Sequence, residues 1–270
     1  MKKTSLGMTA ALVCIITVGN CFADPINNSY GTNITVWDKW RLPQLPPTPP
    51  PGEDQEVEPP DYWGQEWDLE GFFLNGDNLT MIGGFEFTLP GGQRDPFRPN
   101  NYYKSGDIFI STTGTALYGA DIGTSYGSEV VLDNTFGYNY VLKMNWTGGT
   151  YQVYQINGSS HVKTPYFVAN SYSAPWIFVP QNESLIGTFN FAYQQGLSDA
   201  ATGLIGGTHN AVTVDLSFLL HSTPFTVHNT MECGNDLLVG QGTTVPEPTT
   251  FVLLGAGLIG LFGARRIFRK

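Results

Sequence analysis

The sequence is poor in cysteine and in positive charge. Two of its three cysteines, Cys14 and Cys21, lie in the apolar N-terminal stretch, so Cys233 stands alone in the remainder. A lone cysteine excludes an internal disulfide, and we expect it to be buried as a small apolar side chain; pairing between molecules is the alternative. Between residues 24 and 245, 7 basic residues face 22 acidic ones, a net charge of −15. Such a surface repels phosphate backbones, so nucleic acid is not an expected partner.

Amphipathic helices and convincing catalytic signatures are also missing. A G-x-S-x-G motif spans residues 123–127, but it lies among strand-like segments, whereas a nucleophile elbow needs a strand followed by a helix. A G-x-G-x-x-G motif spans residues 255–260, inside an apolar segment with no βαβ unit around it. The four histidines show no H-E-x-x-H spacing. We therefore expect a protein that is not an enzyme.

The N-terminus has the three-part pattern of a secretory signal peptide. Two lysines precede an apolar run over residues 6–18, and small residues occupy the −3 and −1 positions of a cleavage site after Ala23. We therefore predict a signal peptide over residues 1–23 and export of the rest of the chain through the inner membrane. The alternative, a lipid anchor on Cys21, is disfavoured by Asn20 just before it.

An extended arm is expected over residues 24–62. It contains one strand-like run at residues 34–37, followed by eight prolines between positions 43 and 60. Proline fixes φ and removes a backbone donor, so this stretch cannot join the interior of a sheet. We expect an extended, proline-rich and acidic linker.

From residue 63 to 243 the composition changes to aromatic, β-branched and glycine residues, and we expect the ectodomain there. Period-two alternation, the pattern of strands with one buried face, covers residues 189–194, 212–220 and 225–231. Further strands are predicted at residues 79–89, 107–112, 138–146 and 151–156, the last two joined as a hairpin through Thr147, Gly148 and Gly149. The predicted fold class is all-β, an antiparallel β-sandwich of the jelly-roll or carbohydrate-binding-module type. An N-terminal signal helix and a short C-terminal membrane helix would flank it.

The C-terminal tail, residues 244–270, combines three ordered features. They are a Pro-Glu-Pro triplet at Pro246, Glu247 and Pro248, an uncharged apolar segment over residues 251–264, and a basic end that begins with Arg265 and Arg266. Fourteen helical residues span about 21 Å, which is short of the ~30 Å hydrocarbon core. The tail therefore predicts a marginal transmembrane helix with its basic end in the cytoplasm.

This tail resembles the PEP-CTERM sorting signal that exosortases recognise. The resemblance rests on Pro246, Glu247 and Pro248, with the apolar helix, Arg265 and Arg266 behind them. It implies an exosortase as processing partner, transient anchoring in the inner membrane, and a cut near the Pro-Glu-Pro that releases the ectodomain to the cell surface or extracellular matrix. Segments of the body, such as Ser105-Gly106-Asp107-Ile108 and Glu232-Cys233-Gly234, are similar to exosortase-dependent surface proteins of unknown molecular activity.

Eight carboxylates and no basic residue lie between residues 53 and 70. Because Ca²⁺ prefers oxygen ligands, one hypothesis is a calcium site. Its proposed ligands are Glu56, Glu58, Asp68, Glu70 and Asp107. The alternative is a solvated acidic linker with no cofactor, which we favour because no EF-hand spacing occurs.

Aromatic residues in predicted loops suggest a second kind of site. Apolar ring faces suit the C–H groups of sugar rings. The candidate ligand-binding rings are Tyr102, Tyr103, Tyr172 and Trp176, whereas Trp67 and Trp146 lie in strand patterns and are expected in the core.

Together these patterns predict an exported surface protein with a structural or adhesive role in exopolysaccharide or biofilm. One alternative is a carbohydrate-binding module, calcium-dependent in one version. The other is a glycan hydrolase, which needs two carboxylates facing across a cleft. Asp68 or Glu70 with Asp107 is the only pair that we nominate for that role.

Overall fold

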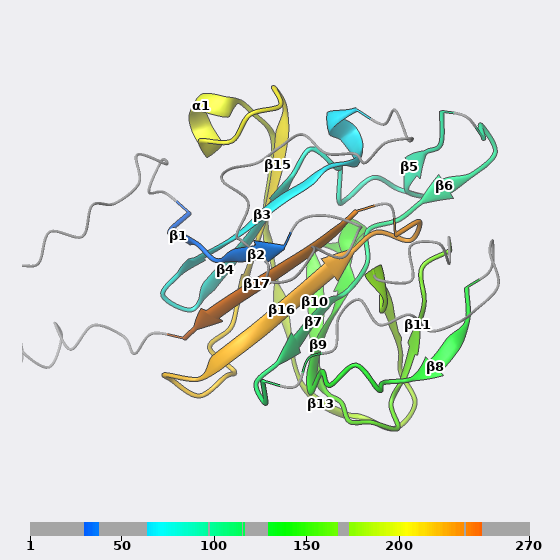
Figure 1. Cartoon of the computed structure of the whole chain (residues 1–270), viewed down its shortest axis with the longest axis vertical. Helices are drawn as coiled ribbons and strands as arrows, with labels where there is room; N and C mark the ends of the chain where they lie inside the picture. Colours follow the sequence, from blue (N-terminus) through cyan, green and yellow to red (C-terminus); the bar gives the residue numbers. More distant parts are fainter. Residues whose placement is uncertain are drawn as a thin grey trace, which may run out of the picture.

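The computed structural model of the protein describes residues 30–37, 64–96, 98–114, 116, 129–166, 173–234 and 236–244. Within these ranges nearly all regular structure is β (Figure 1), and the one α-helix is α1, Asp199–Thr202. All described strand pairs are antiparallel. The prediction of an all-β, antiparallel fold is confirmed.

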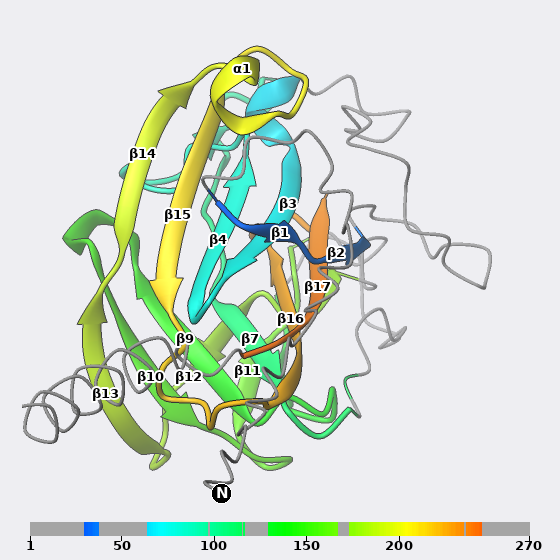
Figure 2. The same ribbon diagram turned by 90° about the vertical axis from the view of Figure 1, so that its left-hand side faces the viewer.

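Two large sheets make up most of the body (Figure 2). The five-stranded sheet has the order β1 (Thr32–Asn33), β3 (Leu69–Asn75), β4 (Asn78–Gly83), β15 (His209–Asp215) and β14 (Ala192–Leu197). The seven-stranded sheet has the order β13 (Ser184–Asn190), β10 (Thr150–Gln155), β9 (Tyr140–Asn145), β7 (Ile108–Ser111), β16 (Pro224–Thr230), β17 (Leu237–Thr243) and β2 (Thr35–Trp37).

Smaller elements complete the described part. A three-stranded sheet has the order β12 (Ile177–Val179), β11 (His161–Lys163) and β8 (Val131–Asp133), and β5 (Gln93–Arg94) pairs with β6 (Tyr102–Tyr103). Two short 3₁₀ helices are η1 (Gln65–Trp67) and η2 (Trp146–Gly148).

The two large sheets contribute to one hydrophobic core. Leu79 and Val212 enter it from the five-stranded sheet, and Leu142 and Val227 enter it from the seven-stranded sheet. Successive side chains of a strand point to opposite faces, so the period-two alternation in the sequence places these apolar residues on the inner faces. Cys233 is fully buried in the same core, which confirms the expectation of burial.

The predicted hairpin forms as expected. Strands β9 and β10 pair from Asn145 and Thr150 to Tyr140 and Gln155. Gly149 closes the turn with φ of 68°, a left-handed conformation that glycine adopts without steric cost.

Three strand boundaries differ from the prediction. The run over residues 212–220 is a strand only as far as Asp215, because the Asp215 carboxylate accepts a 2.7 Å hydrogen bond from the Ser217 N–H in a turn. The run over residues 189–194 belongs to two strands, β13 and β14, in different sheets. The run over residues 79–89 is a strand only to Gly83.

Part of the predicted arm belongs to the body. Strand β1 pairs with β3, and β2 pairs with β17, so residues 32–37 extend both large sheets. The predicted signal peptide, the proline-rich stretch and the tail beyond Thr244 lie outside the described residues. None of the helices in the described ranges has the length and apolar composition that a membrane span requires.

Candidate functional site

A pocket of about 280 Å³ lies where four segments meet: the loop after β4, the residues before β7, the end of β9 and the residues around the start of β12. Its aromatic lining residues are Phe87, Trp146 and Trp176, and its charged or hydroxyl-bearing ones include Glu86, Lys104, Ser105 and Asp107. We call it the Trp146 pocket. Its volume is close to the lower end of small-molecule sites, roughly 300 Å³, so its size suits a single small group such as one sugar ring.

Trp146 is held in a fixed orientation at the wall of the pocket. Its ring stacks on Phe87 at a centroid distance of 5.6 Å and an interplanar angle of 23°. Its Nε1–H donates a 3.1 Å hydrogen bond to the carbonyl oxygen of Ser105. The side chain is only partly buried, so a tryptophan that is already ordered remains accessible at the pocket.

Asp107 is a buried carboxylate that ties three strands together. One oxygen accepts a hydrogen bond from the Met144 N–H at 2.8 Å, and the other accepts one from the Phe178 N–H at 2.9 Å. Burial raises the pKa of Asp107 to about 6, although nearby Lys143 and these two N–H groups act to lower it. Because β9 and β12 both donate to this carboxylate, its first effect is to position the walls of the pocket.

Two further polar atoms at the pocket residues have spare hydrogen-bonding capacity. The Ser105 hydroxyl oxygen and the Trp176 Nε1 are buried and have no hydrogen-bond partner among the described residues. A buried polar group without a partner costs about 1–3 kcal/mol, and such groups call for an explanation.

A larger groove of about 570 Å³ runs over β7, β16 and β17. The described residues of its lining are mostly hydroxyl, amide and glycine residues and include the ring of Phe225. Among the described residues that line it, none is charged and no rings stack, so the Trp146 pocket is the better candidate for specific binding.

A buried polar cluster that was not predicted from the sequence lies where β3 and β15 begin. His209 Nδ1 lies 2.7 Å from a carboxylate oxygen of Glu70, and both side chains are completely buried. His209 Nε2 lies 3.0 Å from a carboxylate oxygen of Asp199 at the start of α1, and Gln65 donates to Glu70 from η1. The hydrogen bond from His209, then that from the Gly207 N–H, lowers the pKa of Asp199. The cluster thus links two strands, a 3₁₀ helix and α1.

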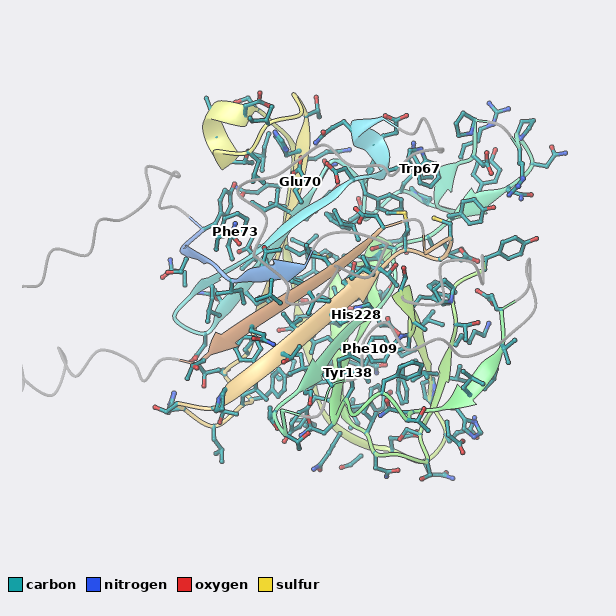
Figure 3. All side chains as sticks on the ribbon, in the orientation of Figure 1. Trp67, Glu70, Phe73, Phe109, Tyr138 and His228 are labelled. Carbon is teal, nitrogen blue, oxygen red and sulfur yellow. The ribbon has the colours of Figure 1, made fainter. Side chains whose placement is uncertain are left out.

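A second buried histidine, His228 of β16, packs in the seven-stranded sheet between aromatic rings. Its ring stacks on Tyr138 at 5.8 Å, and Phe109 lies beside both (Figure 3). Nε2 lies 3.0 Å from the carbonyl oxygen of Pro175, and burial lowers the pKa of His228 to about 4. Figure 3 shows it well apart from Glu70. This histidine supports the fold and is no part of the pocket.

The proposed calcium ligands are not brought together where the structure describes them. Glu70 faces His209, Asp107 accepts from β9 and β12, and Asp68 is buried next to β3. No group of three or more His, Cys, Asp or Glu that could hold a metal occurs among the described residues. Glu56 and Glu58 lie outside these residues, so calcium binding through them stays a prediction.

The four candidate ligand-binding rings differ in their exposure, and ligand binding by them stays a prediction. Tyr103 is 3% and Trp176 is 4% exposed, whereas Tyr102 is 49% exposed; Tyr172 lies outside the described residues. Tyr103 turns inward because β6 packs it against Trp67, with ring centroids 6.1 Å apart. Trp176 belongs to the pocket, together with Asp107 and with Trp146, which the sequence analysis assigned to the core.

Comparison with known proteins adds information on the tail alone. The family model of the PEP-CTERM protein-sorting motif matches residues 244–267. The chain carries a PEP-CTERM sorting motif. No curated protein and no solved structure matches the chain.

The PEP-CTERM motif confirms the predicted resemblance. It is consistent with an exosortase-dependent protein and implies export, a C-terminal sorting signal to the cell surface, and processing by an exosortase. Its residues Pro246, Glu247, Pro248, Arg265 and Arg266 lie outside the described residues. The motif begins at residue 244, directly after β17 ends at Thr243, so the tag follows the last strand of the body without a spacer.

Proposed function

We propose that this chain is a non-enzymatic surface protein that binds saccharide through the Trp146 pocket, and so plays an adhesive or structural part in exopolysaccharide or biofilm. The PEP-CTERM motif supports a location at the cell surface. The interpretation of the body as a β-sandwich of the carbohydrate-binding type fits two antiparallel sheets that share one core.

The observation that carries this proposal is the fixed, accessible ring of Trp146. Stacking on Phe87 and the hydrogen bond to Ser105 order the indole before any ligand arrives. Pre-ordered side chains lose little conformational entropy on binding, so more of the contact energy appears as affinity. A sugar ring can place its C–H face on the indole and its hydroxyl groups toward the Glu86 and Lys104 side chains, which line the same pocket.

Hydrolysis is the weaker reading of the same pocket. Glu86 and Asp107 both line it, and a hydrolase needs two carboxylates that act on the sugar bond. However, both oxygens of Asp107 accept backbone N–H bonds that hold β9 and β12 in place. A carboxylate with this structural task is poorly placed to act as nucleophile or to transfer protons. We therefore assign Asp107 a positioning role and propose binding without cleavage.

Calorimetric titration of the processed protein with oligosaccharides from the exopolysaccharide of its own producer tests the proposal. We expect binding by the natural protein and an affinity at least about tenfold lower for Trp146→Ala, which is about 1.4 kcal/mol. Tyr102→Ala is the matched control, because Tyr102 is exposed but does not line the pocket. It should bind like the natural protein.

Three outcomes would contradict the proposal. They are absence of binding by the natural protein, unchanged affinity of Trp146→Ala, and release of reducing ends during the titration, which would identify a hydrolase. The same titration with Ca²⁺ or with a chelator tests the calcium-dependent version, since only that version predicts a difference.

A further inference from the structure

One continuous segment forms an edge of both large sheets. Strand β13 is the first strand in the order of the seven-stranded sheet, and β14 is the last in that of the five-stranded sheet. Only Phe191 separates them, so residues 184–197 follow two sheet edges in turn. Figure 2 shows β13 and β14 one after the other along the left side of the molecule.

This edge lacks two of the features that usually protect a sheet edge, although a register shift interrupts β13 between Leu185 and Gly187. Residues 184–197 contain no charged side chain and no proline, although the exported part of the chain carries a net charge of −15. Leu185, Ile186 and Phe189 of β13 are 48%, 44% and 36% exposed. Natural edges carry lysine, proline or charged residues because unpaired N–H and C=O groups otherwise pair with another strand. An uncharged apolar edge of seven residues, the length of β13, is a template for such pairing.

The charge distribution points to a second copy of this chain as the partner. Two molecules that each carry an excess of acidic residues repel one another, and the repulsion is smallest where neither contributes a charge. The nearest charged residues in the sequence, Glu183 and Asp199, lie just beyond the two ends of the segment. Identical strands pair antiparallel about a two-fold axis, which gives the closed, self-complementary interface typical of dimers.

We infer that two copies associate through β13, antiparallel about an axis close to Thr188. The two seven-stranded sheets then form one continuous sheet across the dimer. Thr188 is exposed and lies in the regular part of β13, after the register shift that separates Leu185 from Gly187. Threonine pairs directly across antiparallel strands are favourable, whereas like charges in the same position are unfavourable. The dimer doubles the number of saccharide pockets on one particle.

Charge variants at this position test the inference. In the processed protein, we expect sedimentation equilibrium to give a dimer for the natural chain, and a dissociation constant raised at least about tenfold for both Thr188→Lys and Thr188→Glu. Because the axis brings position 188 of one copy next to position 188 of the other, an equimolar mixture of the two variants should dimerise again. Gln241→Lys is the matched control, since Gln241 is exposed on β17, a strand with neighbours on both sides.

Circular dichroism and the melting temperature of each variant separate loss of pairing from loss of fold, and the restored mixed dimer cannot come from unfolded protein. A natural chain that stays monomeric, Thr188 variants that dimerise like Gln241→Lys, or a mixture that stays monomeric overturns the inference. The inference is also overturned if exopolysaccharide protects the β13 amides from hydrogen exchange while the protein forms no dimers.

Discussion

His209 Nδ1 lies 2.7 Å from a carboxylate oxygen of Glu70, and neither side chain has any exposed surface. The two residues are 139 positions apart, and they meet because β3 and β15 both pair with β4, on opposite sides of it. Desolvation makes a buried polar pair expensive to break, since removal of one partner leaves the other without compensation.

We predict that His209→Leu lowers the free energy of unfolding by about 3–5 kcal/mol, and that Glu70→Leu does the same. The double variant should lose less than the sum of the two, because it leaves neither partner uncompensated. Urea denaturation measures all three. Asp199→Asn is the control and should lose less than either single variant, because the Asp199 side chain is half exposed. Additive losses in the double variant would show that the pair is not coupled.

The contact between Glu70 and His209 could not be predicted from the sequence, whereas much of the fold could. Period-two alternation was enough for the all-β class, and the Thr147-Gly148-Gly149 turn between two predicted strands was enough for the β9–β10 hairpin, because both follow from local backbone geometry. Nothing local connects Glu70 to His209, and the run of carboxylates around Glu70 suggested a solvated or calcium-binding segment instead. A histidine in an otherwise β-forming run, His209 to Asp215, was the one signal available.

The positions of two tryptophans could not be predicted for a related reason. Trp176 lies outside the strand patterns and was therefore named as a candidate ligand-binding ring in a loop. It is buried, because its neighbourhood packs over Asp107, whose backbone N–H donates to the carbonyl oxygen of Trp176 at 2.8 Å. Trp146 sits in a strand pattern and was expected in the core, but it follows the end of β9 and reaches the pocket. Burial of aromatic residues depends on which loops meet, and that is set by the order of strands in the sheets.

Asp107 and His228, both buried and ionisable, should have opposite effects on how stability depends on pH. The folded-state pKa of Asp107 is about 6, above its ordinary 3.8, so the folded protein holds this proton more tightly than the unfolded chain does. The contribution of this proton to the free energy of unfolding is therefore lost as pH rises from about 4 to 6. The folded-state pKa of His228 is about 4, below its ordinary 6.5, so its contribution is complete above about 6.5 and is lost as pH falls toward 4.

We therefore predict that substitution of Asp107 and substitution of His228 change the pH dependence of the melting temperature in opposite directions. The melting temperature of Asp107→Asn minus that of the natural protein should rise with pH between 4 and 6. The same difference for His228→Gln should fall over this range. Calorimetric melting at several pH values measures the difference curves. Parallel curves for the three proteins would show that these side chains do not titrate as their burial indicates.

Gly106 should be intolerant of any side chain, because a Cβ atom there would lie 2.3 Å from the carbonyl oxygen of Thr230 and 2.4 Å from that of Trp176. Both obstacles are backbone, so the strands must move. We predict that Gly106→Ala lowers the free energy of unfolding by about 1–3 kcal/mol and weakens saccharide binding, since it displaces Trp176. Gly158→Ala is the control, where a Cβ atom meets only the Asn134 carbonyl oxygen, at 4.0 Å. Equal stability of the two variants would contradict the prediction.

The absence of a spacer between β17 and the PEP-CTERM motif leads to the last prediction. Thr244 is buried, and its hydroxyl donates to the carbonyl oxygen of Leu220 at 2.8 Å while accepting from the Thr223 N–H at 3.1 Å. The body is thus fixed within two residues of Pro246, which brings folded protein close to the processing enzyme.

We predict that a flexible Gly-Ser insertion after Thr244 speeds the conversion of precursor to processed protein in pulse-chase labelling, whereas alanine at Pro246, Glu247 and Pro248 makes the precursor accumulate. The same insertion between β8 and β9, at the exposed Thr135, is the control and should leave the conversion rate unchanged. A rate that the tail insertion does not alter would mean that the folded body does not limit access to the motif.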